Sequence, residues 1–132
     1  MKSNRALLLP LAAILIACGG GADPDAYQAA TELANAKEAE ARALAVTTPC
    51  AQVSECAYLT FMSPTGGCSG WYYTPYLLVS SSAAAASAAA TEQNALARKA
   101  IVLAPPTGIF CPAFVAPPPV LACTASTCVA VR

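Results

Sequence analysis

The sequence predicts an α+β protein, in which an N-terminal spacer helix precedes a small disulfide-stapled domain with a short antiparallel sheet and one alanine-rich helix. Three observations predict this class. The chain has 132 residues, which is enough for one domain. Beyond the first eighteen residues it holds six cysteines, an even number that can form three disulfides. Two alanine-rich stretches without Gly or Pro favour helices, and short runs of aromatic and β-branched residues favour strands.

The N-terminal segment has the features of an export signal. A short basic start precedes an uncharged apolar run over residues 7–16, which is far shorter than the ~20 residues of a membrane-spanning helix. The run ends in Leu15-Ile16-Ala17-Cys18. This ending resembles the lipobox of bacterial lipoproteins, in which the cysteine takes the lipid because its thiolate is the nucleophile. The resemblance implies that residues 1–17 are a signal peptide and that Cys18 is lipidated.

An ordinary signal peptide cut after Ala17 is the alternative. The cysteine count favours lipidation, because an oxidising compartment suits an even number of remaining thiols. Two or more acyl chains hold a protein stably on a bilayer, so we expect membrane attachment through the N-terminal lipid. By resemblance to Gram-negative lipoprotein sorting, Gly19 after the lipidated cysteine implies the outer membrane, facing the periplasm, with surface exposure left open.

Residues 18–24 are expected to form the lipidated cysteine and a flexible tether, and residues 25–46 a spacer helix. Asp23 suits the N-cap and Pro24 the first helical position. The apolar stripe of this helix is weak, comprising Tyr27, Ala30, Leu33 or Ala34, Ala41 and Leu44. We therefore expect the helix to raise the domain above the membrane, and its docking on the core is the alternative.

Residues 47–132 are expected to form the six-cysteine domain. Alternation over residues 57–62 predicts a strand with Leu59 and Phe61 on one face, and residues 76–80 are a second strand candidate. The later elements are a helix from Ser81 or Ser82 to about Ala100, an edge strand over 109–115, and strands over 120–123 and 128–131. A four-residue connection between the last two strands predicts a closing hairpin.

The six cysteines allow fifteen disulfide pairings, and the sequence alone does not choose among them. Cys50 and Cys56 can pair only around a tight turn, because an extended chain holds them ~20 Å apart and a disulfide needs Cα atoms within ~7 Å. We favour long-range links, in which Cys68 joins Cys111 and the terminal hairpin is tied back to Cys50 and Cys56. The candidate disulfide residues are therefore Cys50, Cys56, Cys68, Cys111, Cys123 and Cys128. Zinc is disfavoured by the spacing and by the absence of His, so we expect no metal and no cofactor.

The cysteine spacing over residues 49–131 resembles that of small secreted or lipoprotein domains of proteobacteria whose function is unknown. In these domains a C-G-G-P-like turn leads into an aromatic strand. Here the turn is Cys68-Ser69-Gly70-Trp71, in which Ser69 and Trp71 replace Gly and Pro, and the resemblance implies an aromatic strand from Tyr72 to Tyr76. The shared motifs are cysteines and turns, so the resemblance implies no catalytic residue.

The composition leaves little catalytic chemistry. The chain has no His, and the charged residues between Cys56 and Val131 are Glu92, Arg98 and Lys99. A Ser-His-Asp triad is therefore excluded, as is a carboxylate pair within that stretch. The formal net charge of zero lacks the basic footprint of nucleic-acid binding. We expect neither an enzyme nor a nucleic-acid partner.

One group of aromatic residues suits recognition: Trp71, Tyr72, Tyr73 and Tyr76. Tyr and Trp are favoured anchors at interfaces, so an envelope protein or a glycan is the expected partner. The alternative is that alternate residues of this group pack into the core. We expect Pro117–Pro119 to stiffen a loop, with a role as a groove ligand as the alternative. The expected function is a non-enzymatic envelope module; a purely structural component and an inhibitor or immunity-type protein, acting on a secreted enzyme or toxin, are the alternatives.

Overall fold

The structure is a computed structural model that describes residues 23–65, 70–106 and 117–131. Its elements in chain order are α1 (Pro24–Leu44), the 3-10 turn η1 (Val53–Glu55), β1 (Cys56–Met62), β2 (Trp71–Leu77), α2 (Ala83–Leu103), β3 (Val120–Thr124) and β4 (Thr127–Val131). The predicted α+β class is confirmed. The signal peptide, Cys18, the tether, Cys68, Cys111 and the edge strand expected over 109–115 lie outside the described residues.

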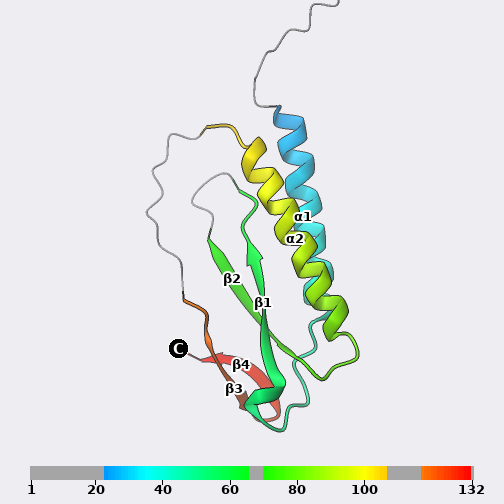
Figure 1. Cartoon of the computed structure of the whole chain (residues 1–132), viewed down its shortest axis with the longest axis vertical. Helices are drawn as coiled ribbons and strands as arrows, with labels where there is room; N and C mark the ends of the chain where they lie inside the picture. The colour runs from blue at the N-terminus through cyan, green and yellow to red at the C-terminus, as the bar shows by residue number, and fades with distance from the viewer. Residues whose placement is uncertain (1–22, 66–69, 107–116, 132) are drawn as a thin grey trace, which may run out of the picture.

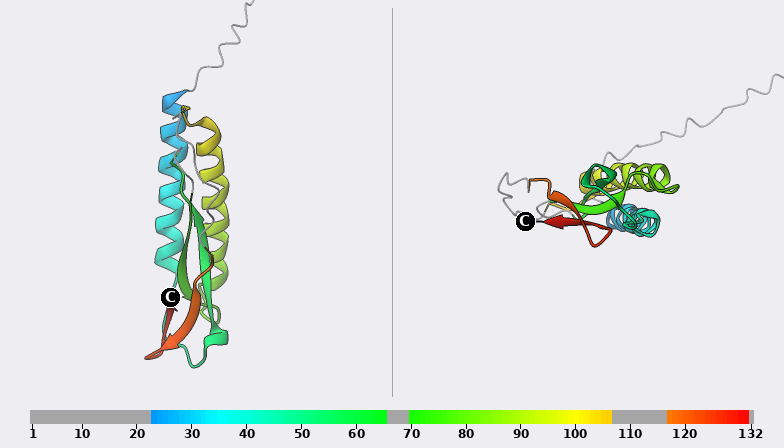
Figure 2. Two further views of the ribbon diagram at one scale, coloured as in Figure 1. Left: turned by 90° about the vertical axis from the view of Figure 1, so that its left-hand side faces the viewer. Right: turned by 90° about the horizontal axis from the view of Figure 1, so that it is seen from below.

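The two helices form one layer of the molecule and a two-stranded sheet forms the other. α1 and α2 run antiparallel and side by side (Figure 1). The antiparallel pair β1–β2 lies along the helices, and the separate hairpin β3–β4 lies near the end remote from the start of α1 (Figure 2). The first helix is therefore part of the folded domain. This is the docked arrangement given above as the alternative, and the helix is not a free spacer.

Alanine side chains at the helix interface explain why α1 docks. α1 buries Ala30, Ala34 and Ala41, whereas Leu33 is 56% exposed. α2 buries seven residues. Ala89 is one, and the other six follow alternating spacings of three and four, the repeat of packed helices: Ala83, Ala86, Ala90, Gln93, Ala97 and Ala100. The distance between packed helices depends on the side chains at the contact, so methyl groups allow a close approach. Such a stripe looks weak by hydropathy, which is why the sequence favoured a spacer.

Polar caps connect the helix ends. The Asp23 carboxylate accepts hydrogen bonds from the backbone N–H groups of Asp25 (3.0 Å) and Ala26 (3.3 Å), which confirms the predicted N-cap. Ser82 occupies the N-cap position of α2 but makes no side-chain capping bond there. Its hydroxyl instead donates to the backbone carbonyl of Leu44 at 2.7 Å. The hydroxyl of Ser82, where the helix was expected to begin, therefore satisfies the last turn of α1 and ties the two helices together.

The first strand forms as predicted, and the second begins earlier than residues 76–80. Leu59 and Phe61 are buried at 3% and 0% exposure. β1 pairs with β2 from Met62 opposite Trp71 to Cys56 opposite Leu77. Residues 78–80 have no strand partner because β1 begins at Cys56, so they turn into α2 although their sequence is apolar. The range that the resemblance implied, 72–76, lies within β2.

Amide side chains of α2 cover the free edge of β1. Gln93 is fully buried, and its Nε2 donates to the carbonyl of Met62 at 2.8 Å while its Oε1 accepts from the Met62 N–H at 3.4 Å. The Asn94 Nδ2 donates to the carbonyl of Thr60 at 2.8 Å. These amides satisfy backbone groups that a further strand would otherwise pair.

The closing hairpin has a two-residue connection, not the four-residue connection that the sequence predicted. Thr124 pairs with Thr127, which leaves Ala125 and Ser126 in the turn with φ angles of 48° and 57°. Two successive left-handed residues define a type I′ turn, which Asn-Gly favours. Ala-Ser has no such preference, so the turn carries no signal in the sequence.

Replacing Ala125 by Asn and Ser126 by Gly is expected to raise the free energy of unfolding by about 1–2 kcal/mol. A left-handed conformation costs ordinary residues roughly 1–2 kcal/mol each, and Asn and Gly tolerate it. Urea denaturation of the full chain measures the gain. The control Ala130→Asn places the same side chain in β4, where it should gain nothing, and a double variant no more stable than the wild type would contradict the turn geometry.

Candidate recognition groove and sulfur cluster

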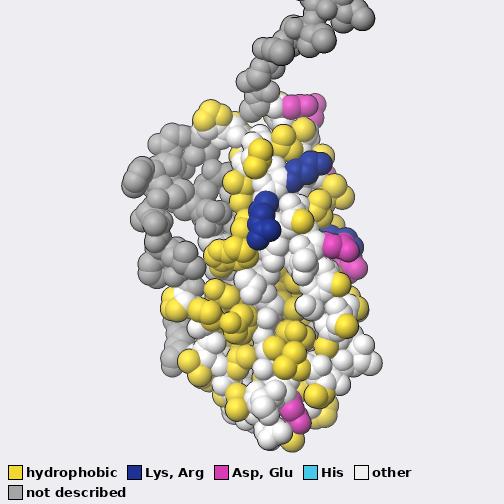
Figure 3. All heavy atoms as spheres, in the orientation of Figure 1, with side chains coloured by type: hydrophobic (Ala, Val, Ile, Leu, Met, Phe, Trp, Pro, Cys, Tyr) yellow, Lys and Arg dark blue, Asp and Glu magenta, His cyan; other side chains and the backbone are white. Residues whose placement is uncertain are grey.

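An uncharged groove of about 610 Å³ lies between the start of β2 and the closing hairpin. Its described lining residues are Trp71, Tyr72, Tyr73, Pro117, Pro118, Pro119, Val120, Ala130 and Val131. On the face drawn in Figure 3, hydrophobic side chains gather between β2 and the start of β3, and the charged side chains lie along the helices and at the lower end. The volume lies within the range of ligand-binding clefts.

The alternation of β2 divides the four aromatic residues between its two faces. Trp71 and Tyr73 share the face that points away from the helices, since Tyr72 lies opposite the buried Phe61. Tyr76 is 7% exposed and belongs to the core beneath the helices. Its burial removes Tyr76 from the candidate recognition surface.

Tyr72 is among the residues that line the groove, and its side chain is held firmly on the side of β2 that faces the helices. Its hydroxyl donates a hydrogen bond to the Glu38 carboxylate, and its ring stacks on Phe61 with centroids 5.6 Å apart. The Arg42 guanidinium lies 5.0 Å from the Phe61 ring and 5.7 Å from the Tyr72 ring. It also donates to Glu38 at 2.7 Å and to the Thr74 hydroxyl at 2.6 Å. Tyr72 thus supports the position of its neighbours in β2.

Burial, and then the hydrogen bond to Glu38, raise the pKa of the Tyr72 hydroxyl above its ordinary value of about 10. The folded protein therefore retains this proton at a pH where the unfolded chain loses it. The stabilisation that the protonated Tyr72 hydroxyl gives the folded state is therefore fully present below about pH 10 and is lost as the pH rises further.

We therefore expect the free energy of unfolding to fall more steeply above about pH 10 in the wild type than in Tyr72→Phe. Urea denaturation at several alkaline pH values measures the two slopes. Tyr58→Phe is the matched control, because it removes a tyrosine hydroxyl from the other face of the sheet and leaves the hydrogen bond between Tyr72 and Glu38 in place. Equal slopes for the wild type and Tyr72→Phe would contradict the assignment.

The outer face of β2 brings distant parts of the chain together. The Tyr73 ring makes an edge-to-face contact with Tyr58, with centroids 5.1 Å apart. Pro117–Pro119 line the same groove as Trp71 and Tyr73. The sequence predicted the aromatic group and the stiff proline segment separately. Nothing in the sequence indicates that they share a groove, because they are far apart in the chain.

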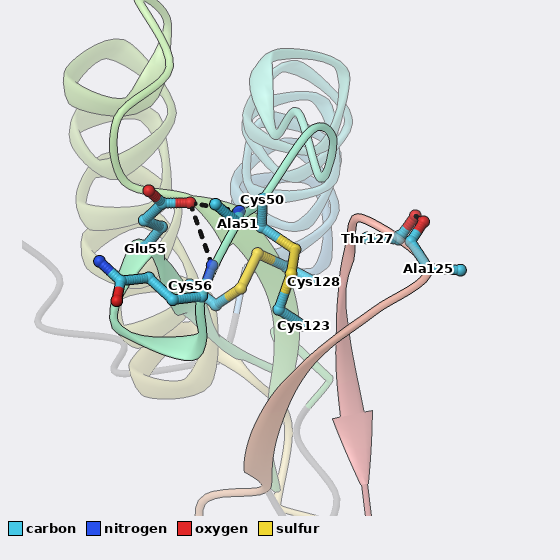
Figure 4. Close-up of a disulfide and its surroundings, with 9 residues drawn as sticks. Cys50, Ala51, Glu55, Cys56, Cys123, Ala125, Thr127 and Cys128 are labelled. Atoms are coloured by element: carbon cyan, nitrogen blue, oxygen red, sulfur yellow. Dashed lines mark hydrogen bonds between the residues drawn. A yellow bond between two sulfur atoms is a disulfide. The ribbon is translucent and has the colours of Figure 1, made fainter.

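Two disulfides form a second feature, at the hairpin end of the domain. Cys50 is bonded to Cys123 and Cys56 to Cys128, with Cα atoms 6.0 Å and 5.6 Å apart. Figure 4 shows the two bonds close to each other. The prediction that the hairpin is tied back to Cys50 and Cys56 is confirmed.

A short turn places Cys50 and Cys56 beside each other. The Glu55 carboxylate accepts hydrogen bonds from the N–H groups of Ala51 (2.6 Å) and Gln52 (3.4 Å), so the chain doubles back through η1 (Figure 4). As a result the Sγ atoms of Cys50, Cys56 and Cys128 all lie within 4.8 Å of one another. Structural zinc is bound by thiolates, and these sulfur atoms are in disulfide bonds.

No family model, curated protein or solved structure matches this chain. The geometry defines the class of the protein as a small α+β domain with disulfide-bonded cysteines. Neither helix in the described part of the chain has the length and apolar character needed to cross a membrane.

Proposed function

We propose that this chain is a lipid-anchored lipoprotein of the cell envelope, whose folded domain is a non-enzymatic binding module. The lipobox Leu15-Ile16-Ala17-Cys18 supports cleavage and lipidation at Cys18, and Gly19 supports an outer-membrane location facing the periplasm. The two disulfides support an oxidising compartment outside the cytosol.

The observation that carries the binding role is the uncharged groove in which Trp71 and Tyr73 accompany Pro117–Pro119. Aromatic anchors supply large contact areas at interfaces. The described walls of the groove bear no charge and few hydrogen-bonding groups, which favours an apolar segment of an envelope protein over a glycan. A neutral glycan stacked on the rings is the alternative ligand.

The fold supports presentation of the hairpin away from the membrane. Cys18 precedes Asp23, the cap of α1, by only a few residues. The 21 residues of α1 span about 30 Å, and the hairpin lies near the far end of the helix pair (Figure 1). A protein held at Cys18 extends this end into the aqueous space.

The ion pairs of the helices lie away from the groove. Lys37 contacts Glu40 at 2.8 Å and Glu92 at 2.9 Å, and hydrogen bonds to these carboxylates raise the pKa of its amine. These groups lie on the helices, outside the residues that line the groove. Exposed pairs of this kind contribute little stability.

The test compares the full-length lipidated wild type with Trp71→Ala and Tyr73→Ala in pull-downs of envelope components, with and without crosslinking. We expect a partner that the wild type binds to be lost from both variants. Leu33→Ala is the matched control, because it removes an exposed apolar side chain from α1. Partner binding that persists in variants with native circular dichroism would overturn the groove assignment.

Intact-mass analysis tests the anchor separately. The mature wild type is expected to lack residues 1–17 and to carry fatty acids. The Cys18→Ser variant is expected to carry no fatty acids. A mature mass without acyl chains would overturn the lipoprotein assignment. The small stapled fold also suits an inhibitor or immunity-type protein, for which cells expressing the chain must resist a secreted enzyme or toxin.

A further inference from the structure

We propose that the four sulfur atoms of the two described disulfides form a thiol–disulfide exchange site. A partner dithiol attacks this site at Cys123, and Cys50 passes the exchange to the second disulfide. The proposal rests on the unequal accessibility and close spacing of the four cysteines, independently of the ligand of the groove.

Cys123 is the most exposed residue of the four. Cys50, Cys56 and Cys128 are 4%, 8% and 2% exposed, whereas Cys123 is half-buried on β3. Exchange begins when a thiolate reaches a disulfide sulfur. An external thiolate that attacks Cys123 forms a mixed disulfide with it and expels Cys50 as a thiolate.

Cys50 lies next to the other disulfide. Its Sγ is within 4.8 Å of the Sγ atoms of both Cys56 and Cys128. The hydrogen bonds of Glu55 hold the turn that follows Cys50, so the freed thiolate stays near this position (Figure 4). It attacks one sulfur of the Cys56–Cys128 bond, forms a new disulfide and expels the other sulfur as a thiolate.

The partner dithiol supplies the two electrons that the exchange requires. Its second thiol attacks the mixed disulfide at Cys123, so the partner departs as a disulfide and two electrons pass to this protein. One of the two disulfides is lost: Cys50 is bonded to Cys56 or Cys128, and Cys123 and the remaining cysteine become thiols after taking protons from water. In the Cys50–Cys56 product neither described disulfide ties the hairpin to β1. Because the hairpin forms one wall of the groove, that wall is then held in the described part of the chain by non-covalent contacts alone, such as the hydrogen bond from the Cys128 N–H to the Thr47 carbonyl.

The first test is limited reduction of the oxidised full-length protein with substoichiometric dithiothreitol, followed by acid quenching, alkylation and peptide mapping. Cleavage after Glu55 separates Cys50 from Cys56, and fragmentation of the C-terminal peptide separates Cys123 from Cys128. In the species that has lost one of these disulfides, we expect Cys50 to remain bonded while Cys123 is alkylated together with Cys56 or Cys128. Alkylation of Cys50 and Cys123 together, with Cys56–Cys128 intact, would overturn the proposal.

A matched pair of variants tests the direction of the relay. Cys123→Ser and Cys50→Ser remove the same disulfide but leave different thiols. In Cys123→Ser most molecules are expected to hold Cys50 in a disulfide, whereas in Cys50→Ser the Cys123 thiol should be alkylated freely. If Cys50 in the Cys123→Ser variant is alkylated as extensively as Cys123 in the Cys50→Ser variant, Cys50 has no specific role in the exchange. If either variant fails to fold, limited reduction of the wild type decides.

Discussion

Removing both described disulfides is expected to lower the free energy of unfolding by about 7 kcal/mol, whereas removing either one alone costs about 3 kcal/mol. The two bonds close nearly the same loop, with sequence separations of 73 and 72 residues. A single loop of this length is worth about 4 kcal/mol on the chain-entropy argument. While one bond remains, the second closes only the small ring through both disulfides, which is worth about 3 kcal/mol.

The measurement is urea denaturation of three variants that leave every other cysteine in place. Cys50→Ser with Cys123→Ser and Cys56→Ser with Cys128→Ser each remove one bond, and the quadruple variant removes both. Domains of this size are typically stable by 5–15 kcal/mol, so the quadruple variant is expected to be largely unfolded or marginal. A quadruple variant no less stable than either double variant would contradict the argument.

The α+β class, both helices, the first strand and the closing hairpin followed from local signals. The N-cap at Asp23, the alternation that buries Leu59 and Phe61, and the alanine-rich composition of α2 each act over a few residues. Such features are predictable because they depend on spacing within one segment. The tie of the hairpin to Cys50 and Cys56 was favoured but not fixed by the sequence, because disulfide geometry showed only that those two cysteines can pair with each other around a tight turn.

The features that the sequence left open depend on contacts between distant segments. The docking of α1 depends on alanines whose small contact looks weak until α2 is placed against them. The end of β2 depends on where its partner β1 begins. The groove needs Trp71 and Pro117 on facing elements, and no spacing rule connects them. The separation of Tyr76 from the recognition surface, in contrast, follows from the alternation of a strand once its limits are known.

The groove and the sulfur cluster share one structural dependence, because the hairpin contributes to both. Val120 and Val131 line the groove at one end of the hairpin, and Cys123 and Cys128 hold the hairpin to the domain near its turn. The backbone adds further ties, since the N–H of Cys128 donates to Thr47 at 2.9 Å. The shape of the groove therefore depends on the state of the disulfides, and measurements of binding should be made on protein whose disulfides have been mapped.

Gln93→Met is expected to lower the free energy of unfolding by about 2–3 kcal/mol. Gln93 occupies a position in the α2 repeat where the neighbouring buried positions are alanines, and its amide bonds both the N–H and the carbonyl of Met62. A methionine keeps much of the volume but leaves these backbone groups without their partners, and unsatisfied buried groups cost about 1–3 kcal/mol each.

The matched control is Asn94→Ala, which removes one hydrogen bond to Thr60 at a half-buried position and is expected to cost about 1 kcal/mol. Urea denaturation gives both free-energy changes. Hydrogen exchange of the Met62 backbone N–H measures directly how well the free edge of β1 is protected. Faster exchange at Met62 in Gln93→Met, with slow exchange retained at Leu59, locates the effect at the edge of β1. Wild-type stability and unchanged exchange at Met62 would show that the amide of Gln93 does not stabilise this edge.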